Sequence, residues 1–513
     1  MNSSVMASVT TFAVYLLLMV VIGVWVFRRT VNLSDYVLGG RQLNSWVAGL
    51  SANASDFSAW LLLGLPGAIY LSGLGEAWIA VGLAVGFAAS WYLLAGRLRV
   101  FTERATDARS GGESNSLTLS SYLENRFDDR GGTLRAVSAV LILVFYLFYV
   151  ASGLVAAGGL FEQVFGVSGN VAILTGVTVV VVYTFFGGFL AVSFTDVIQA
   201  AMMWCALLVV PVVAIVAVSG DPDRGAGGDL GSLLGGVSGL DGSWAPADAL
   251  VPVVVISGLA WGLGYFGQPH ILARFMGIRS PGDVRAAGVV SVGWAVSAMA
   301  LALVVALAGV AYFDPPLDEQ TAEYVFPQLI QALMNPWVAG LLLAAILAAV
   351  MSTADSQLLV ASAALTEDGY RTFVNREASP RALVWISRAA VVLVAAVAAG
   401  IALSGNNTIM ELVGYAWAGF GAGFGPVILL SLYWRRMNRV GALAGMITGG
   451  FVAVAWDLLD ERVLDTGLYA MVPAVALSFL AILVANRLGR ASQQMEQDFD
   501  RVDAEYRGLN AVG

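Results

Sequence analysis

The sequence predicts an all-α membrane protein with about 13 transmembrane helices. Three observations carry this prediction: the composition, the length of the apolar runs and the placement of arginine. Hydrophobic residues make up 58% of the 513-residue chain and charged residues only 12%, whereas a soluble protein carries about 25% charged residues. So few polar side chains do not cover a water-soluble globule of this size. The composition therefore excludes a soluble enzyme, a nucleic-acid-binding protein and a disordered chain.

The apolar runs match the thickness of a bilayer, which requires about 20 apolar residues per helix. The first run, Thr10–Phe27, has no positive charge before it and is followed by Arg28 and Arg29. A secretory signal has its basic residues first, so we expect a retained span with its N-terminus outside. The expected spans are residues 7–27, 43–73, 76–96, 133–163, 168–189, 193–219, 248–268, 286–312, 328–366, 383–404, 408–433, 439–457 and 467–488.

Arginine supports this topology, because the cytoplasmic loops of membrane proteins are enriched in positive charge. All 26 basic residues are arginine, and all but Arg224 and Arg462 fall in segments that the order of spans places in the cytoplasm. Acidic residues such as Asp221 and Asp314 gather in loops on the opposite side. An odd number of spans then predicts an external N-terminus, a cytoplasmic C-terminus and a short charged surface helix after Arg490.

Cysteine and histidine each occur once, as Cys205 and His270. A single cysteine excludes an intrachain disulfide, and a single histidine excludes a metal site built on several histidines. The sequence contains no phosphate-binding loop and no nucleophile-elbow motif. The chain is therefore not expected to be an enzyme, and His270 is expected to be structural.

Two predicted spans are interrupted by residues that break helices. The second contains polar and small residues from Ser51 to Gly67, and the seventh contains a glycine-rich stretch from Ser257 to Pro269. These spans start five spans apart and therefore enter the membrane from opposite sides. The pattern predicts an inverted-topology repeat with two discontinuous helices and a transport site between them near the bilayer midplane. The alternative is that glycine and proline are simply common in membrane helices.

Asp56 lies inside the second span, next to Ser55. A charged aspartate at the bilayer centre costs about 2.5–3.5 kcal/mol and usually serves ions, protons or substrate. The alternative is an aspartate at a helix break that is satisfied by local N–H groups. Unwound backbone at such a break exposes carbonyl oxygens that attract a cation and N–H groups that attract a carboxylate.

The ninth span carries a second polar face. Ser352, Asp355 and Ser356 follow i, i+3, i+4 spacing, and Thr353 adjoins them. Because hard cations take oxygen ligands, the hydroxyls of Ser352 and Thr353 could complete a sodium site with carbonyls of the second span. The alternative is that these hydroxyls bond to their own helix. Asp196, at the cytoplasmic mouth of the sixth span, is either a helix cap or part of an ion exit path.

Aromatic residues form a third group. Most aromatic side chains of a membrane protein lie in its core or in its interface belts. Trp60, Trp261 and Tyr265 lie in the broken segments themselves, which favours the lining of a pocket. A ring face suits a ligand ammonium group and a ring edge suits an apolar substrate. Arg41 is expected to anchor the topology rather than to bind a ligand.

Six segments together resemble the sodium/solute symporter family, and they extend over nearly the whole chain. The most specific of them is Trp261–Phe275. The resemblance implies a leucine-transporter-like fold, in which spans two to eleven form a five-plus-five inverted repeat with one span before it and two after it. The segments are Ser34–Arg41, Ala54–Ala68, Tyr183–Ser193, Trp261–Phe275, Ala348–Thr353 and Tyr415–Gly421.

The resemblance also implies the cargo, namely Na⁺ and L-proline imported together across the plasma membrane by alternating access. Sodium would bind the carbonyls of Ala54, Phe57 and Ala349 and the side chains of Ser352 and Thr353, with Asp56, Asp196 and Asp355 as accessory carboxylates. Proline would contact Ser58, Trp60, Gly64, Tyr149, Trp261, Tyr265 and Pro269.

Three residues depart from the family pattern. Phe57 and Ala59 stand where methionine and glycine are expected, and Asp355 stands where a small neutral residue is expected. The first two changes leave the backbone carbonyls in place but narrow the pocket, whereas Asp355 bears on ion stoichiometry or proton involvement. The alternative functions are symport of another small amino acid or a carboxylate, and a non-transporting solute sensor, for which the short tail offers no output module.

The expected organisation follows from the spans and the repeat. No nucleic acid and no obligatory protein partner are expected. The segments are residues 1–42 with the first span and a cytoplasmic link, 43–219 as the first repeat, 220–247 as an extracellular loop, 248–433 as the second repeat, 434–490 as two peripheral spans and 491–513 as a cytoplasmic tail.

Overall fold

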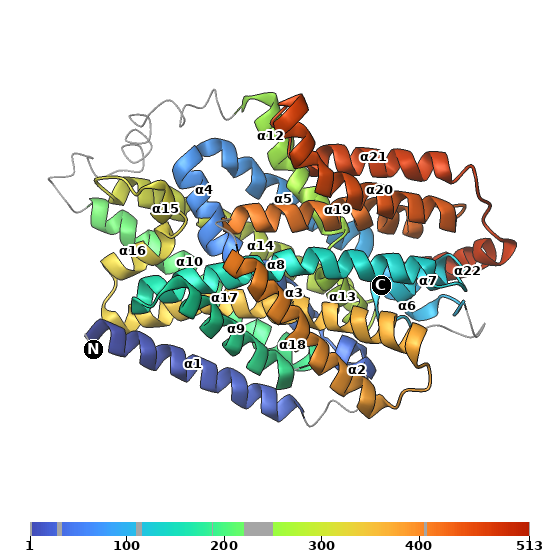
Figure 1. Ribbon diagram of the computed structural model, residues 1–513, viewed down its shortest axis with the longest axis horizontal. Coiled ribbons are helices and arrows are strands. Elements are labelled where there is room, and N and C mark those ends of the chain that lie inside the picture. Colours follow the sequence, from blue (N-terminus) through green and yellow to red (C-terminus); the bar gives the residue numbers. More distant parts are fainter. Residues whose placement is uncertain are drawn as a thin grey trace.

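The computed structural model describes residues 3–27, 33–108, 115–186, 188–219, 250–404 and 408–511. The predicted loop at 220–247 lies outside the described residues. The described part of the chain is helical and has no β-sheet, and its long helices lie side by side along the longest axis of the molecule (Figure 1). Among these residues nine helices are long and apolar enough to cross a membrane, and a bent pair adds a tenth span. Three further apolar helices in the same ranges are shorter.

The helices of the first half of the chain begin and end at residues that favour helix ends. The Asn44 side chain accepts a hydrogen bond from the Val47 N–H at 3.0 Å and caps α3. Gly132 and Gly166 flank α8 with φ values of 71° and 65°, which suit glycine. The helices are α1 (Ser3–Phe27), α2 (Leu33–Leu38), α3 (Ser45–Asp56), α4 (Leu65–Ser72), α5 (Ala77–Ser90), α6 (Gly96–Arg104), α7 (Leu119–Arg126), α8 (Thr133–Phe165), α9 (Gly169–Phe186) and α10 (Phe189–Ser219).

The second half has the same all-helical build. Its Thr408 and Glu411 form a reciprocal capping box at the start of α19. The helices are α12 (Pro252–Ala260), α13 (Pro269–Gly277), α14 (Asp283–Tyr312), α15 (Glu319–Ala322), α16 (Val325–Leu333), α17 (Pro336–Ala363), α18 (Pro380–Ser404), α19 (Ile409–Tyr433), α20 (Arg439–Leu459), α21 (Met471–Ala485) and α22 (Gln493–Ala511).

The predicted boundaries of the seventh and ninth spans are wrong. The ninth span was expected from residue 328, but α16 is a separate helix and α17 begins at Pro336, because the Asn335 side chain caps the N–H groups of Trp337 and Val338. The seventh span was expected to end at residue 268, but it continues as α13 to Gly277. Pro269 occupies the first position of this new helix, where proline is favoured.

Burial places α17 and α19 at the centre of the molecule. Of the most apolar stretch of each helix, 83% and 89% of the residues are buried, against 28% for α1. The helix α3 packs against α17, α10, α13 and α14. The first broken span therefore lies where other helices surround it, rather than against lipid.

The third and seventh spans approach each other through glycine. A Cβ atom on Gly86 would lie 2.0 Å from the carbonyl oxygen of Gly262, and one on Gly82 would lie 2.5 Å from that of Gly258. Contacts this close require glycine, as at many helix interfaces in membranes. The backbones of α5 and of the α12 span therefore touch directly.

The charged tail folds as α22, as predicted. Asp503 of α22 pairs with Arg97 of α6 at 2.6 Å, and Phe499 packs against Phe101 with ring centroids 5.4 Å apart. Val502 is completely buried. The N-terminus and α22 lie toward opposite ends of the long axis (Figure 1).

Candidate functional site

The first break separates α3 from α4. The helix α3 ends at Asp56, and the chain resumes as a π-helical turn, Trp60–Gly64, that continues into α4. The two parts are bent by 63°. The freed carbonyl of Asp56 accepts hydrogen bonds from the Ser58 N–H at 2.9 Å and the Trp60 indole at 3.0 Å. The predicted discontinuity in the second span is therefore present.

Hydroxyl groups of α17 meet the carbonyls of α3 beside this break. The Ser352 hydroxyl lies 2.7 Å from the Ala54 oxygen and 3.1 Å from the Ala349 oxygen, and the Thr353 hydroxyl lies 3.4 Å from the Ala54 oxygen. The structure thus brings together four of the five predicted sodium ligands, and the fifth, Phe57, directly follows the last residue of α3. The alternative of bonding within the helix is true only in part, because Ser352 also reaches across to α3.

Asp56 faces the second broken span. Its carboxylate is completely buried, and its Oδ2 atom accepts a hydrogen bond from the Tyr265 hydroxyl at 2.6 Å. Its Oδ1 atom has no hydrogen-bond partner. The alternative in which local N–H groups satisfy Asp56 is therefore wrong. A buried carboxylate oxygen without a donor suits a nearby cation, because burying an unpaired charge is costly.

The second break separates α12 from α13. A 3-10 segment, Trp261–Phe266, follows α12, and Gly267 and Gln268 are not helical. Tyr265 points from this segment to Asp56, and its ring centroid lies 4.8 Å from that of Phe87. Both predicted breaks are therefore present, and Asp56 and Tyr265 bridge them.

The predicted substrate residues do not all gather at one point. Trp60 and Ser58 lie at the first break, and the Tyr149 ring packs edge-on to His270 at 6.0 Å. The Trp261 ring instead stacks on Tyr469 at 4.8 Å, toward the peripheral helices. Two further members of the predicted set lie elsewhere. Gly64 lines an outer cavity, and Pro269 is the first residue of α13.

Trp417 belongs to the site and was not predicted as a site residue. Its indole N–H donates to the Trp261 carbonyl at 2.7 Å, and its ring lies edge-on to Tyr265 at 5.0 Å. The only signal in the sequence is its position in the segment Tyr415–Gly421, because a lone tryptophan in an apolar span is usually a core residue.

A polar cluster lies on the other side of α3. Asp196 is inside α10, not at its end, so the interpretation as a helix cap is wrong. Its Oδ2 atom accepts hydrogen bonds from Ser51 at 2.6 Å, Ser55 at 3.1 Å and Arg274 at 3.3 Å. The Arg274 side chain also donates to Ser356 at 2.5 Å.

Asp355 adjoins this cluster through a 3.3 Å contact between its Oδ1 atom and the Ser356 hydroxyl, and its Oδ2 atom has no partner. The placement of Arg274 in a cytoplasmic loop is wrong, since the side chain is completely buried. One buried arginine therefore faces two buried carboxylates.

Arg41 is also more than an anchor at the membrane surface. The residue is only 8% exposed, and its guanidinium donates to the Met276 carbonyl, the Thr102 side chain and the Ser116 carbonyl. Burial lowers the pKa of Arg41 to about 10, so it remains charged at neutral pH. Arg41 thus ties the segment before α3 to the ends of α13 and α6.

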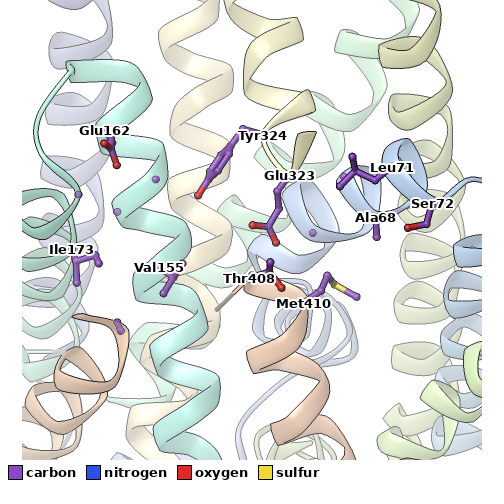
Figure 2. Close-up of a pocket in the computed structure, with 16 residues that line it drawn as sticks. Ala68, Leu71, Ser72, Val155, Glu162, Ile173, Glu323, Tyr324, Thr408 and Met410 are labelled. Atoms are coloured by element: carbon purple, nitrogen blue, oxygen red, sulfur yellow. The ribbon is translucent and has the colours of Figure 1, made fainter. Parts of the chain in front are cut away.

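A cavity of about 740 Å³ opens on the α15–α16 side of the molecule (Figure 2). Glu162 of α8 lies on one side of it, and Glu323 and Tyr324 project into it opposite α8. Glu323 accepts a hydrogen bond from the Ile409 N–H at 2.9 Å, and burial raises the pKa of this carboxyl. The cavity reaches Gly64, one helical turn from Trp60.

Two broken helices around buried carbonyls, hydroxyls and a carboxylate define a secondary transporter for a small solute and a hard cation. No group of three or more His, Cys, Asp or Glu side chains suited to a metal occurs among the described residues. The hydroxyl and carbonyl oxygens that meet beside the first break are of the kind that suits an alkali ion.

Comparison with known proteins identifies the family. The model of the sodium:solute symporter family matches residues 36–449, and the chain belongs to this family. It is 47% identical to the sodium/proline symporter of Escherichia coli (strain K12), over 97% of the chain and 96% of that protein. It is 44% identical to the high-affinity proline transporter PutP of Bacillus subtilis (strain 168), over 94% of the chain and 98% of that protein. It is a transporter and not an enzyme.

Among solved structures, the fold is similar to that of a Na⁺-coupled sialic acid symporter in a substrate-bound outward-open state. The TM-score is 0.77 and the identity 19%, and the match covers 95% of this chain and 99% of the other. At this identity the likeness shows the fold alone.

Proposed function

We propose that this protein imports L-proline together with Na⁺ across the plasma membrane by alternating access. The relatives with 44–47% identity over nearly the whole chain are named as proline transporters. The observation that carries the proposal is the meeting of the Ser352 and Thr353 hydroxyls with the Ala54 carbonyl across the first break. One Na⁺ moving inward supplies about 2.3 kcal/mol per 100 mV of membrane potential.

The proposed sodium site consists of the carbonyls of Ala54, Phe57 and Ala349 and the hydroxyls of Ser352 and Thr353. All five residues are at most 2% exposed. Asp56 supplies the negative charge nearby through its unpaired Oδ1 atom. Sodium would hold the end of α3 against α17, and in this way order the break that binds the substrate.

The proposed proline site lies between the two breaks. Proline offers a carboxylate that suits free N–H groups, a secondary ammonium that suits carbonyls and aromatic faces, and a ring that packs against apolar surface. The hydrogen bonds of Trp60 and Tyr265 to Asp56 support the assignment of these two side chains to the proposed site. The remaining proposed contacts are Ser58, Gly64, Tyr149, Trp261 and Pro269, of which Trp261 would contribute through its backbone rather than its stacked ring.

Asp196 and Asp355 are proposed as accessory carboxylates on the path to the cytoplasm. Each has one buried oxygen without a partner. Asp196 pairs with the buried Arg274 directly, and Asp355 is linked to Arg274 through the Ser356 hydroxyl. Two negative groups beside one positive group leave a site that favours a passing cation. The Asp355 carboxylate is also a group that could bind a proton in place of the sodium ion.

The proposed topology has 13 spans, with the two repeats running from α3 to α10 and from α12 to α19. The shorter helices α9, α12 and α21 then count as spans. The end of the molecule with α6, α7 and α22 carries Arg97 and Arg126, and the other end carries Glu162 and Glu323. The positive-inside rule assigns the first end to the cytoplasm, so we propose an external N-terminus and a cytoplasmic C-terminus, within the segments 1–42, 43–219, 220–247, 248–433, 434–490 and 491–513.

The proposal is tested by uptake of radiolabelled proline into proteoliposomes under an inward Na⁺ gradient. Replacement of Na⁺ by choline at equal ionic strength should abolish accumulation. Competition by other amino acids and by carboxylates measures the substrate range. Accumulation that persists in choline would refute sodium coupling, and binding without any uptake would support a solute sensor instead.

A further inference from the structure

Trp417 of α19 is held against the backbone of the second break. Its side chain is 1% exposed, and its indole N–H donates a 2.7 Å hydrogen bond to the Trp261 carbonyl, at the first residue of the 3-10 segment. A Cβ atom on Gly264 would lie 2.0 Å from the Trp417 Nε1 atom. The indole therefore lies directly on the segment, and Gly264 provides the room for it.

The same ring also supports the side chain that crosses between the breaks. Trp417 and Tyr265 pack edge to face, with ring centroids 5.0 Å apart and an interplanar angle of 89°. The Tyr265 hydroxyl donates to the Oδ2 atom of Asp56 at 2.6 Å. An unbroken series of contacts thus runs from α19 through Trp417 and Tyr265 to the end of α3.

A short 3-10 segment has poorer hydrogen-bond geometry than an α-helix and is often a hinge. Where a helix is irregular inside a membrane protein, a donor from a neighbouring element stabilises its backbone carbonyls. The indole N–H of Trp417 supplies this donor to Trp261, and its ring fixes the direction of Tyr265. Without the Trp417 indole, the 3-10 segment would lose one of the contacts that set its position.

We propose that Trp417 is a positioning residue of the substrate site: it fixes the 3-10 segment in the geometry in which the segment receives proline. This role rests on the proposed function, because it concerns the same site. Trp417 acts through the Trp261 carbonyl and the Tyr265 ring rather than through the substrate. Because α19 carries this donor, a movement of α19 would reach the site through the same hydrogen bond.

The test compares two indole–carbonyl hydrogen bonds of similar length. Trp417→Phe keeps an aromatic ring and removes the N–H donor. Trp456→Phe is the matched control, since its indole donates to the Leu468 carbonyl at 2.8 Å in the peripheral helix α20. Proline uptake is measured in proteoliposomes as a function of proline concentration at saturating Na⁺, with the amount of inserted protein quantified for each variant.

A neutral hydrogen bond contributes about 0.5–1.5 kcal/mol. Trp417→Phe should therefore raise the proline concentration for half-maximal uptake about 2- to 13-fold, with the maximal rate per transporter within about twofold of wild type. Trp456→Phe should leave the half-saturation concentration unchanged. A second variant with 3-benzothienylalanine at position 417, in which sulfur replaces the N–H at almost the same shape, should reproduce the shift and guards against a folding defect.

The outcomes separate the two proposals. Wild-type protein without sodium-dependent proline uptake would refute the proposed function before any variant is compared. If the wild type transports proline but both position-417 variants stay within twofold of its half-saturation concentration, the positioning role is overturned. It is also overturned if Trp417→Phe and Trp456→Phe lower only the amount of inserted protein, to the same extent.

Discussion

Replacement of Asp56 by asparagine isolates the charge of this residue from its packing. The two side chains have nearly the same shape, and the asparagine oxygen can still accept the hydrogen bond from the Tyr265 hydroxyl, which measures 2.6 Å in the wild type. The change therefore removes a negative charge and little else. It should weaken sodium binding strongly while the fold is retained.

The size of the effect follows from the position of Asp56. The residue lies two positions after Ala54, whose carbonyl contacts Ser352 and Thr353, so the carboxylate and a bound ion are separated by roughly 6 Å. At an effective dielectric constant of about 20, two unit charges at this distance attract each other by about 3 kcal/mol. The Na⁺ concentration for half-maximal proline binding should then rise about 100-fold.

The assay is binding of radiolabelled proline to purified protein over a range of Na⁺ concentrations, with choline keeping the ionic strength constant. Thermal stability is measured in parallel, and it should not fall, because a buried carboxylate with an unpaired oxygen costs free energy in the folded protein. A half-saturation concentration for Na⁺ within threefold of wild type would refute the placement of the ion beside Asp56.

Three further predictions concern the same framework. Ser352→Ala removes one ligand oxygen and should raise the half-saturation concentration for Na⁺ about 10-fold. An unchanged half-saturation concentration would show that Ser352 is not a sodium ligand. Gly86→Ala places a Cβ atom 2.0 Å from a backbone oxygen of the facing helix and should lower the stability by about 1–3 kcal/mol or more in thermal unfolding, whereas Gly293→Ala enters open space and should be neutral or stabilising by up to about 1 kcal/mol. Equal melting temperatures of these two variants would contradict the close packing. Burial raises the pKa of Glu323 above 4.5, so the folded protein binds this proton more tightly than the unfolded chain does. The stability contributed by Glu323 is present at about pH 4.5 and below and is lost as the pH rises through the raised pKa. Glu323→Gln should therefore melt at a higher temperature than wild type at pH 8, with the difference shrinking toward pH 4.5, and a difference independent of pH would contradict the assignment.

The two helix breaks could be predicted from the sequence because each is marked by residues that disfavour a continuous helix. Asp56 with its flanking serines marked the first break, and the glycines before Pro269 marked the second. The meeting of Ser352 with Ala54 could be predicted only as a pairing of suitable chemical groups, since residues 298 positions apart are brought together by tertiary packing. The spacing of polar residues on a helix indicates a face, but not what the face contacts.

Arg274 shows why the rest could not be predicted. Arginine usually marks the cytoplasmic end of a span, and this regularity places Arg274 in a loop. The structure buries it beside Asp196 in a helix that starts at Pro269. The ion pair joins two residues 78 positions apart and therefore leaves no local pattern in the sequence. The positive-inside rule consequently misplaces a buried arginine that has a buried partner.

The two breaks share a physical requirement that links sodium to substrate binding. At each break a central helix donates a hydrogen bond to a backbone carbonyl: Ser352 of α17 to Ala54, and Trp417 of α19 to Trp261. The Trp417 indole N–H is a hydrogen-bond donor only and cannot ligate a cation, so its hydrogen bond at the second break does not depend on an ion. The Ser352 hydroxyl can either donate its proton to the Ala54 oxygen or turn it away and offer a lone pair to Na⁺ between the two oxygens. In the proposed mechanism the first break is thus the one whose order depends on the ion. It adjoins Asp56 and Tyr265, so we expect sodium to act on the proposed proline site through the end of α3.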